Sequence, residues 1–131
     1  MKKLIVFTLL LLFGVSIHAQ TFVCTDINFY DSDLSSKTIQ KRKQEALGSK
    51  AVLSFYDKSL KITLTDNDGD VESAILDKIT DSEYVAIMNS GQQNMERLEI
   101  KLTKLFEYIR SFTVKTYKSY RLDVEATFKR D

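Results

Sequence analysis

The sequence predicts a small, mainly β protein, an antiparallel meander that forms a small barrel or sandwich. Apolar and polar residues alternate with a period of two through most of residues 20–131. Turn-forming segments separate these runs at a spacing of roughly 8–12 residues. Strands with one apolar face are typical of antiparallel sheets whose other face meets water. These observations favour a single β-rich domain of about eight strands.

The first 19 residues have the pattern of a secretory signal peptide. Two lysines at 2–3 precede an apolar run over 4–15, and Ala19 follows as a small residue at a candidate cleavage site. The run is shorter than the roughly 20 residues that span a bilayer. We therefore divide the chain into a signal peptide, 1–19, and a single mature domain, 20–131. We expect export to the periplasm or the extracellular space, with no stable membrane anchor after cleavage.

Eight strands are expected in the mature domain. Their ranges are 22–30, 51–57, 60–65, 71–78, 83–89, 97–103, 111–117 and 120–128. Turn formers separate several of them, at 57–59, 66–70, 80–82 and 89–92. The last strand alternates most clearly, since its apolar face reads Tyr120, Leu122, Val124, Ala126 and Phe128.

Residues 35–47 do not fit this alternation. The segment is polar and basic, and Ser35 or Ser36 could cap a short helix that Gly48 ends. The apolar stripe of this helix would be thin. A mobile loop is the alternative for the same residues.

A second segment, 95–112, allows a helix as well as strands. It contains no turn-forming residue, and six apolar side chains fall at helical spacing: Met95, Leu98, Leu102, Leu105, Ile109 and Phe112. Ser90 and Gln93 could form a capping box for such a helix. A helix would leave Ile100 exposed, and so we favour strands. The alternative fold class is α+β, with a long helix at 94–112.

Composition excludes several classes of chemistry from the mature domain. The only histidine, His18, lies in the expected signal peptide, so histidine-based triads and zinc sites are closed to residues 20–131. No P-loop, nucleophile elbow or CxxC motif occurs. We expect no catalytic residues and no cofactor. A carboxylate-dependent hydrolase is the less favoured enzymatic alternative.

The single cysteine and the charge balance bear on partners. Cys24 cannot form an intramolecular disulfide, and its place in an apolar strand favours burial. Without Lys2 and Lys3, 17 basic residues face 18 acidic ones, so the mature net charge is −1. A nearly neutral chain has no general attraction to nucleic acid, and we expect no nucleic-acid partner.

Aromatic residues at two strand ends are the candidate ligand site. Phe29-Tyr30-Asp31 recurs as Phe55-Tyr56-Asp57, each followed by a leucine three residues later. Aromatic side chains at strand ends can line the mouth of a barrel, and we assign Phe29, Tyr30, Phe55 and Tyr56 to such a mouth. Packing in the core is the alternative for these residues.

The segment 66–70 is a weak candidate for calcium. Asp66, Asp68 and Asp70 alternate beside Gly69, as carboxylates do in calcium-binding loops. Alignment with the EF-hand pattern fails, because Leu64 and Ile75 would occupy ligand positions. A solvated turn is therefore the favoured interpretation, with no metal bound.

Charge is also segregated along the chain. Seven acidic residues and one basic residue lie between 64 and 83, whereas 37–50 carries five basic residues and one acidic residue. Such opposed patches could guide a protein partner, although solvated faces of this kind are common.

The expected architecture resembles the calycin class of small barrels. This is a likeness of fold, because the lipocalin signature Gly-x-Trp is missing from a chain without tryptophan. Small barrels of eight strands hold one small ligand or fill their interior with side chains. We therefore expect a non-catalytic exported protein that holds a small apolar ligand. The alternative is an interaction or inhibitor-like module with a filled core that binds a protein partner.

Overall fold

A computed structural model describes residues 20–131, apart from 32, 89, 90 and 92. The expected signal peptide at 1–19 lies outside the described residues. So do Ser90, proposed for a capping box, and most of the turn at 89–92.

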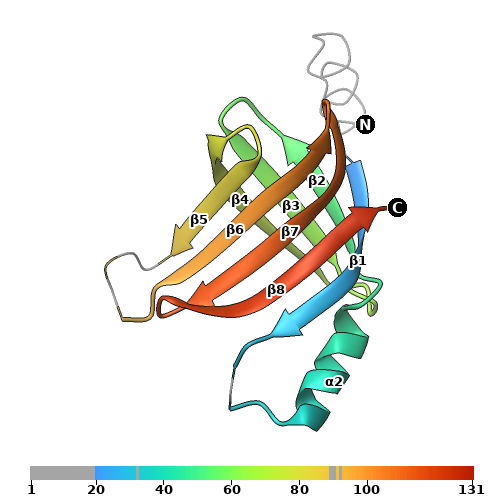
Figure 1. The fold of residues 1–131 in the computed structure, drawn as a ribbon, viewed down its shortest axis with the longest axis vertical. Coiled ribbons are helices and arrows are strands. Elements are labelled where there is room, and N and C mark those ends of the chain that lie inside the picture. Colours follow the sequence, from blue (N-terminus) through green and yellow to red (C-terminus); the bar gives the residue numbers. More distant parts are fainter. Residues whose placement is uncertain (1–19, 32, 89–90, 92) are drawn as a thin grey trace, which may run out of the picture.

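The described chain forms a closed antiparallel barrel of eight strands, in which each strand pairs with its neighbours in sequence (Figure 1). This confirms the predicted fold class. The strands are β1 (Gln20–Phe29), β2 (Lys50–Phe55), β3 (Ser59–Thr65), β4 (Val71–Thr80), β5 (Glu83–Met88), β6 (Glu96–Leu105), β7 (Tyr108–Lys118) and β8 (Arg121–Arg130).

Pairing of the first strand with the last closes the barrel. The register runs from Phe22 opposite Arg130 to Phe29 opposite Val124, with a β-bulge between Cys24 and Asp26. The C-terminal end of β8 therefore lies beside the beginning of β1, as Figure 1 shows.

One helix, α2 (Ser36–Ala46), connects β1 to β2 and lies below the barrel in Figure 1. Ser35 is its N-cap and accepts a hydrogen bond from the Thr38 backbone N–H. Gly48 follows with a φ of +88°, a conformation that glycine adopts without steric cost. The short helix is thus confirmed in preference to a loop. No helix within the described ranges has the length and apolar character that a membrane crossing requires.

The alternative long helix at 94–112 is wrong. Those residues form β6 and β7, joined by a two-residue turn at Phe106 and Glu107 between the paired Leu105 and Tyr108. Phe106 has a φ of +58° and is 93% exposed. The sequence hid this turn because a phenylalanine occupies a position that usually takes glycine, asparagine or aspartate.

Tyr120 also departs from prediction, because it does not belong to the apolar face of the last strand. Lys118 pairs with Arg121, which leaves Ser119 and Tyr120 as a two-residue turn. Both turn residues have positive φ, 49° and 68°, as type I′ hairpins require. The Tyr120 side chain is exposed.

Three phenylalanine rings pack together in the half of the barrel that holds the β4–β5 and β6–β7 turns, the upper half in Figure 1. Phe112 is fully buried, its ring stacked on Phe128 at 4.9 Å and edge-on to Phe22 at 5.0 Å. Further buried residues come from the middle of the barrel: Leu53, Leu60, Ile62, Leu76, Ile100 and Leu102. We call this half the hairpin end, since the β4–β5 and β6–β7 turns lie there, and the opposite half, beside α2, the helix end.

Candidate functional site

The helix end of the barrel encloses a cavity of about 470 Å³. Its inner walls come from β1, β3, β7 and β8, whose inward residues alternate with outward ones. The apolar lining consists of Cys24, Ile27, Phe29, Ala46, Leu64, Val114, Val124, Ala126 and Phe128, and Thr116 adds a hydroxyl. The interior is therefore apolar, as ligand pockets usually are.

Charged residues surround the mouth of this cavity. The β3–β4 turn and the start of β4 contribute Asp66, Asp68, Asp70 and Glu72, and α2 contributes Arg42 and Glu45. The acidic segment at 66–72 and the basic helix, remote in sequence, thus meet at one rim. The acidic and basic segments predicted from the sequence therefore lie next to each other around the mouth of the apolar cavity.

Asn67 fastens the two sides of this rim together. Its side-chain amide donates hydrogen bonds of 2.9 Å to the carbonyl oxygens of Glu45 and Leu47. These carbonyls belong to the last turn of α2 and its C-cap, where helical partners are missing. A Cβ added at Gly48 would lie 3.4 Å from the Asn67 Oδ1 atom, so glycine also suits this contact.

We expect Asn67→Ala to lower the free energy of unfolding by about 1–2 kcal/mol, because two helix-end carbonyls lose their donor. Chemical denaturation followed by circular dichroism measures the change. Asn67→Asp is the matched control: it preserves size but cannot donate, and it should destabilise at least as much. Wild-type stability in both variants would contradict the role assigned to this amide.

The three aspartates proposed for calcium organise a turn. The Asp66 carboxylate accepts hydrogen bonds of 2.9 Å from the backbone N–H groups of Asp68 and Asp70. Gly69 follows with a φ of +88°. Over the described ranges, no group of three or more acidic, cysteine or histidine side chains is arranged to hold a metal ion. The geometry is that of a hydrogen-bonded turn.

The four aromatic residues assigned to one mouth lie at two opposite ends of the barrel. Phe29 lines the helix-end cavity, and Tyr30 is exposed beside it with its hydroxyl 3.4 Å from Glu125 Oε2. Phe55 lies at the hairpin end, where its ring meets Tyr84 edge-on at 6.2 Å, and Tyr56 is exposed. The antiparallel pairing of β1 and β2 is the reason, because it sends their C-terminal ends in opposite directions.

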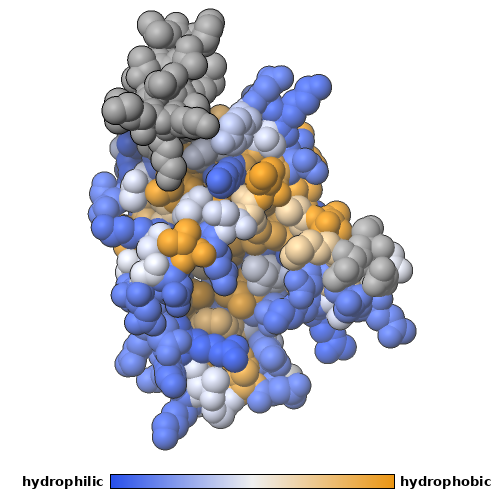
Figure 2. Space-filling model, turned by 180° about the vertical axis from the view of Figure 1, so that it is seen from behind, coloured by the Kyte–Doolittle hydropathy of each residue, from blue (hydrophilic) through white to orange (hydrophobic). Residues whose placement is uncertain are grey.

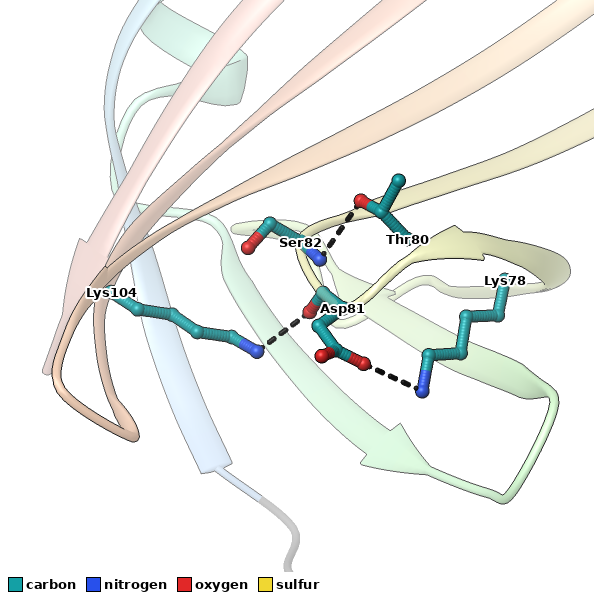
Figure 3. Close-up of polar contacts among 5 residues, drawn as sticks. All are labelled: Lys78, Thr80, Asp81, Ser82 and Lys104. Atoms are coloured by element: carbon teal, nitrogen blue, oxygen red, sulfur yellow. Dashed lines mark hydrogen bonds and ion pairs between the residues drawn. The ribbon is translucent and has the colours of Figure 1, made fainter.

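A smaller hollow of about 250 Å³ lies at the hairpin end, near Phe55, Tyr84 and Ile109. Polar contacts cross it: Lys78 Nζ lies 2.9 Å from Asp81 Oδ1, and Lys104 Nζ donates to the Asp81 carbonyl at 2.6 Å (Figure 3). The Lys78 ammonium lowers the pKa of Asp81, and Asp81 in turn raises the pKa of Lys78. Burial raises the pKa of the Tyr84 hydroxyl. The Lys104 contact joins β6 to the β4–β5 turn at the hairpin end of the barrel.

Cys24 lies on the wall of the larger cavity as a free, buried thiol. Burial raises the pKa of this thiol, which keeps it protonated and slow to react. The cysteine is thus a side chain whose reactivity reports on the interior of the barrel.

No protein-family model matches the chain, and a comparison with curated proteins finds no similar sequence.

Among the site candidates predicted from the sequence, Phe29 lies on the wall of this cavity, and the weak calcium candidates Asp66, Asp68 and Asp70 lie at its rim. The prediction missed Val114, Thr116 and Val124, which alternation assigns to an inward face without saying which part of that face is hollow. It also missed the contribution of α2. The basic composition of that segment was visible, but its contact with the 66–70 turn depends on closure of the barrel.

Proposed function

We propose that this protein is a small, exported, non-catalytic binding protein that holds a small apolar ligand in the helix-end cavity. The cavity carries the proposal. Its volume of about 470 Å³ lies within the range of roughly 300–1,000 Å³ that small-molecule sites occupy, and its walls are apolar. Export rests on the signal-peptide pattern of residues 1–19.

The distribution of side chains favours ligand binding over a module with a filled core. At the hairpin end, three phenylalanine rings and several aliphatic side chains pack against one another, and the hollow there is smaller, about 250 Å³, and lined partly by the charged side chains of Lys78, Asp81 and Lys104. At the helix end, the inward positions carry smaller residues, Ala126, Val114, Thr116 and Val124, and the space between the walls stays open. A protein that required only a stable surface would gain stability by filling this space.

Cys24 supplies a test of occupancy within the protein as it exists. We expect N-phenyl-1-naphthylamine, an uncharged apolar probe, to gain fluorescence on binding. The bound probe should slow alkylation of Cys24 by N-ethylmaleimide by about fivefold or more, since reactivity follows access to the thiol. Mass spectrometry under native conditions measures the extent of alkylation with and without probe.

The control variant carries its thiol at the next residue, whose side chain lies on the outer surface of the barrel. Thr25 is exposed, so Thr25→Cys in a Cys24→Ala background should react equally fast with or without the probe. Absence of probe fluorescence together with unchanged Cys24 alkylation would refute the proposal. For export, the intact mass of the secreted protein should begin at Gln20, and a mass beginning at Met1 would refute cleavage.

A further inference from the structure

The barrel wall is incomplete between β4 and β5 at the helix end. These strands pair only near their shared turn, from Asp77 opposite Val85 to Thr80 opposite Glu83. Residues 71–76 of β4 pair with β3, and residues 86–88 of β5 pair with β6, but these two fully described segments do not pair with each other. In Figure 1, β5 diverges from β4 toward the helix end. We call this gap the β4–β5 seam.

Burial along the inward faces of both strands falls toward the seam. Tyr84 and Met88 occupy the same face of β5, yet Tyr84 is 5% exposed and Met88 is 57% exposed. On β4, Leu76 is fully buried, whereas Glu72 on the same face is exposed. Among the described residues, β5 and β6 contribute none to the lining of the helix-end cavity, although β4 and β7 on either side do. On the side of the seam, the described lining of the cavity ends at Glu72 of β4.

The β1–β2 wall is also paired over a short stretch, but it is covered. These strands pair only from Gln20 to Val23 on β1. The chain leaving α2 continues the wall, because Cys24 N–H donates to the Ser49 carbonyl and Gly48 N–H donates to the Cys24 carbonyl, at 2.8 and 3.0 Å. The β4–β5 seam has no equivalent cover in the described part of the chain.

Apolar side chains border the seam on the outside of the barrel. Figure 2 shows apolar residues gathered on this face. Ile75 and Ile87 are 66% and 51% exposed, and Val71 is a further exposed apolar side chain on the outward face of β4. Exposed apolar groups that collect in one place usually mark a surface that meets another apolar molecule.

The two routes into the cavity thus differ in chemistry. At the rim beside α2, an apolar molecule would pass the carboxylates of Asp66, Asp68 and Asp70, and displacing their hydration is costly. At the seam, it would pass the apolar side chains of Ile75 and Ile87, and Glu72 is the one carboxylate of the described lining on that side. At the hairpin end of the same strand pair, β4 and β5 stay paired from Asp77 opposite Val85 to Thr80 opposite Glu83, and Lys104 of β6 donates to the Asp81 carbonyl of their turn (Figure 3). The strands can therefore separate further at the seam without losing the β4–β5 turn.

We propose that the β4–β5 seam is the side opening through which an apolar ligand enters and leaves the helix-end cavity. This inference rests on the proposed function and adds the route of access to it. The ligand passes between Ile75 and Ile87, and this path avoids the three aspartates of the β3–β4 turn.

A cross-link across the seam tests the route. Continuation of the β4–β5 register would place Ile75 opposite Ile87, so we design Ile75→Cys/Ile87→Cys in a Cys24→Ala background. The cysteines are joined as a disulfide, or by bis-maleimidoethane when their spacing exceeds that of a disulfide. The matched control is Asp77→Cys/Val85→Cys in the same background, which links a pair that the wall already holds together.

Stopped-flow fluorescence with N-phenyl-1-naphthylamine measures association and dissociation. We expect the linked seam to slow both rates by about tenfold or more, because a fastened gate limits exchange. The dissociation constant should change much less. Reduction of the disulfide should restore both rates, and the control link should leave them unchanged.

Exchange at the unlinked rate in fully cross-linked protein, verified by mass, would overturn the side opening and leave the proposed function standing. Equal slowing by the control link would also overturn it, since the effect would then come from general stiffening. Failure of the unlinked protein to bind the probe would remove the proposed function, and the inference with it.

Discussion

Phe112→Ala is expected to lower the free energy of unfolding by about 3–5 kcal/mol, the range for phenylalanine truncation in a core. The side chain is fully buried, and it stacks on Phe128 and meets Phe22 edge-on. Its removal leaves an empty volume between two rings that rigid neighbouring strands keep apart. Because native stabilities are commonly 5–15 kcal/mol, this single change would remove a large part of the total.

The matched control for this prediction is Phe106→Ala, which removes the same side chain from an exposed turn. It should change the free energy of unfolding by less than about 0.5 kcal/mol, as surface substitutions usually do. Urea denaturation followed by far-ultraviolet circular dichroism measures both variants. Similar effects at the two positions would contradict the placement of the core at the hairpin end.

Thr116→Trp is expected to abolish most ligand binding while leaving the fold intact. Thr116 lies on the cavity wall, and an indole has the size to occupy much of a 470 Å³ space. Affinity for N-phenyl-1-naphthylamine should fall by about tenfold or more, since a pocket must be concave and open to bury its ligand. The cost in stability should be small compared with overpacking a dense core, which is about 1–3 kcal/mol.

The control is Lys115→Trp, which places the indole on the opposite face of the same strand. It should bind the probe like the wild type. The chain contains no tryptophan, so the introduced indole is the only one in each variant, and its emission reports its surroundings directly. Emission at a shorter wavelength from Thr116→Trp than from Lys115→Trp would indicate burial. Unchanged probe affinity in a folded Thr116→Trp protein would refute the cavity as the site.

Alternation alone identified the strands, because a half-buried strand must place every second side chain on the core. Leu98, Ile100 and Leu102 illustrate this: a helix would have exposed Ile100, and the structure buries it on β6. Capping chemistry similarly located α2, since Ser35 holds the first turn. Alternation and N-capping each involve residues that are close in sequence, so both can be recognised without knowing the three-dimensional structure.

The candidate site depended on information that no local pattern contains. Phe29 and Phe55 look equivalent in sequence, but the direction of each strand decides at which end its last residue lies. The cavity likewise arises where β7, β8 and β1 curve past α2, and only closure of the barrel brings these elements together. The short pairing of β4 with β5 is also a property of register, which two adjacent alternating runs leave undetermined.

Because β1 pairs with β8, the eight strands form a closed ring in which each strand has two paired neighbours. Every other strand pair joins consecutive segments, so β1 with β8 is the one pairing in the described chain between the two extremes of the sequence. The Asp131 backbone N–H reaches the Thr21 carbonyl at 3.3 Å, so the beginning of β1 and the end of β8 meet at one place. In such a ring, the strand pairing does not depend on which loop contains the chain termini. A short linker from Asp131 to Gln20, with the chain reopened at the exposed turn between β2 and β3, would keep every strand beside the same neighbours.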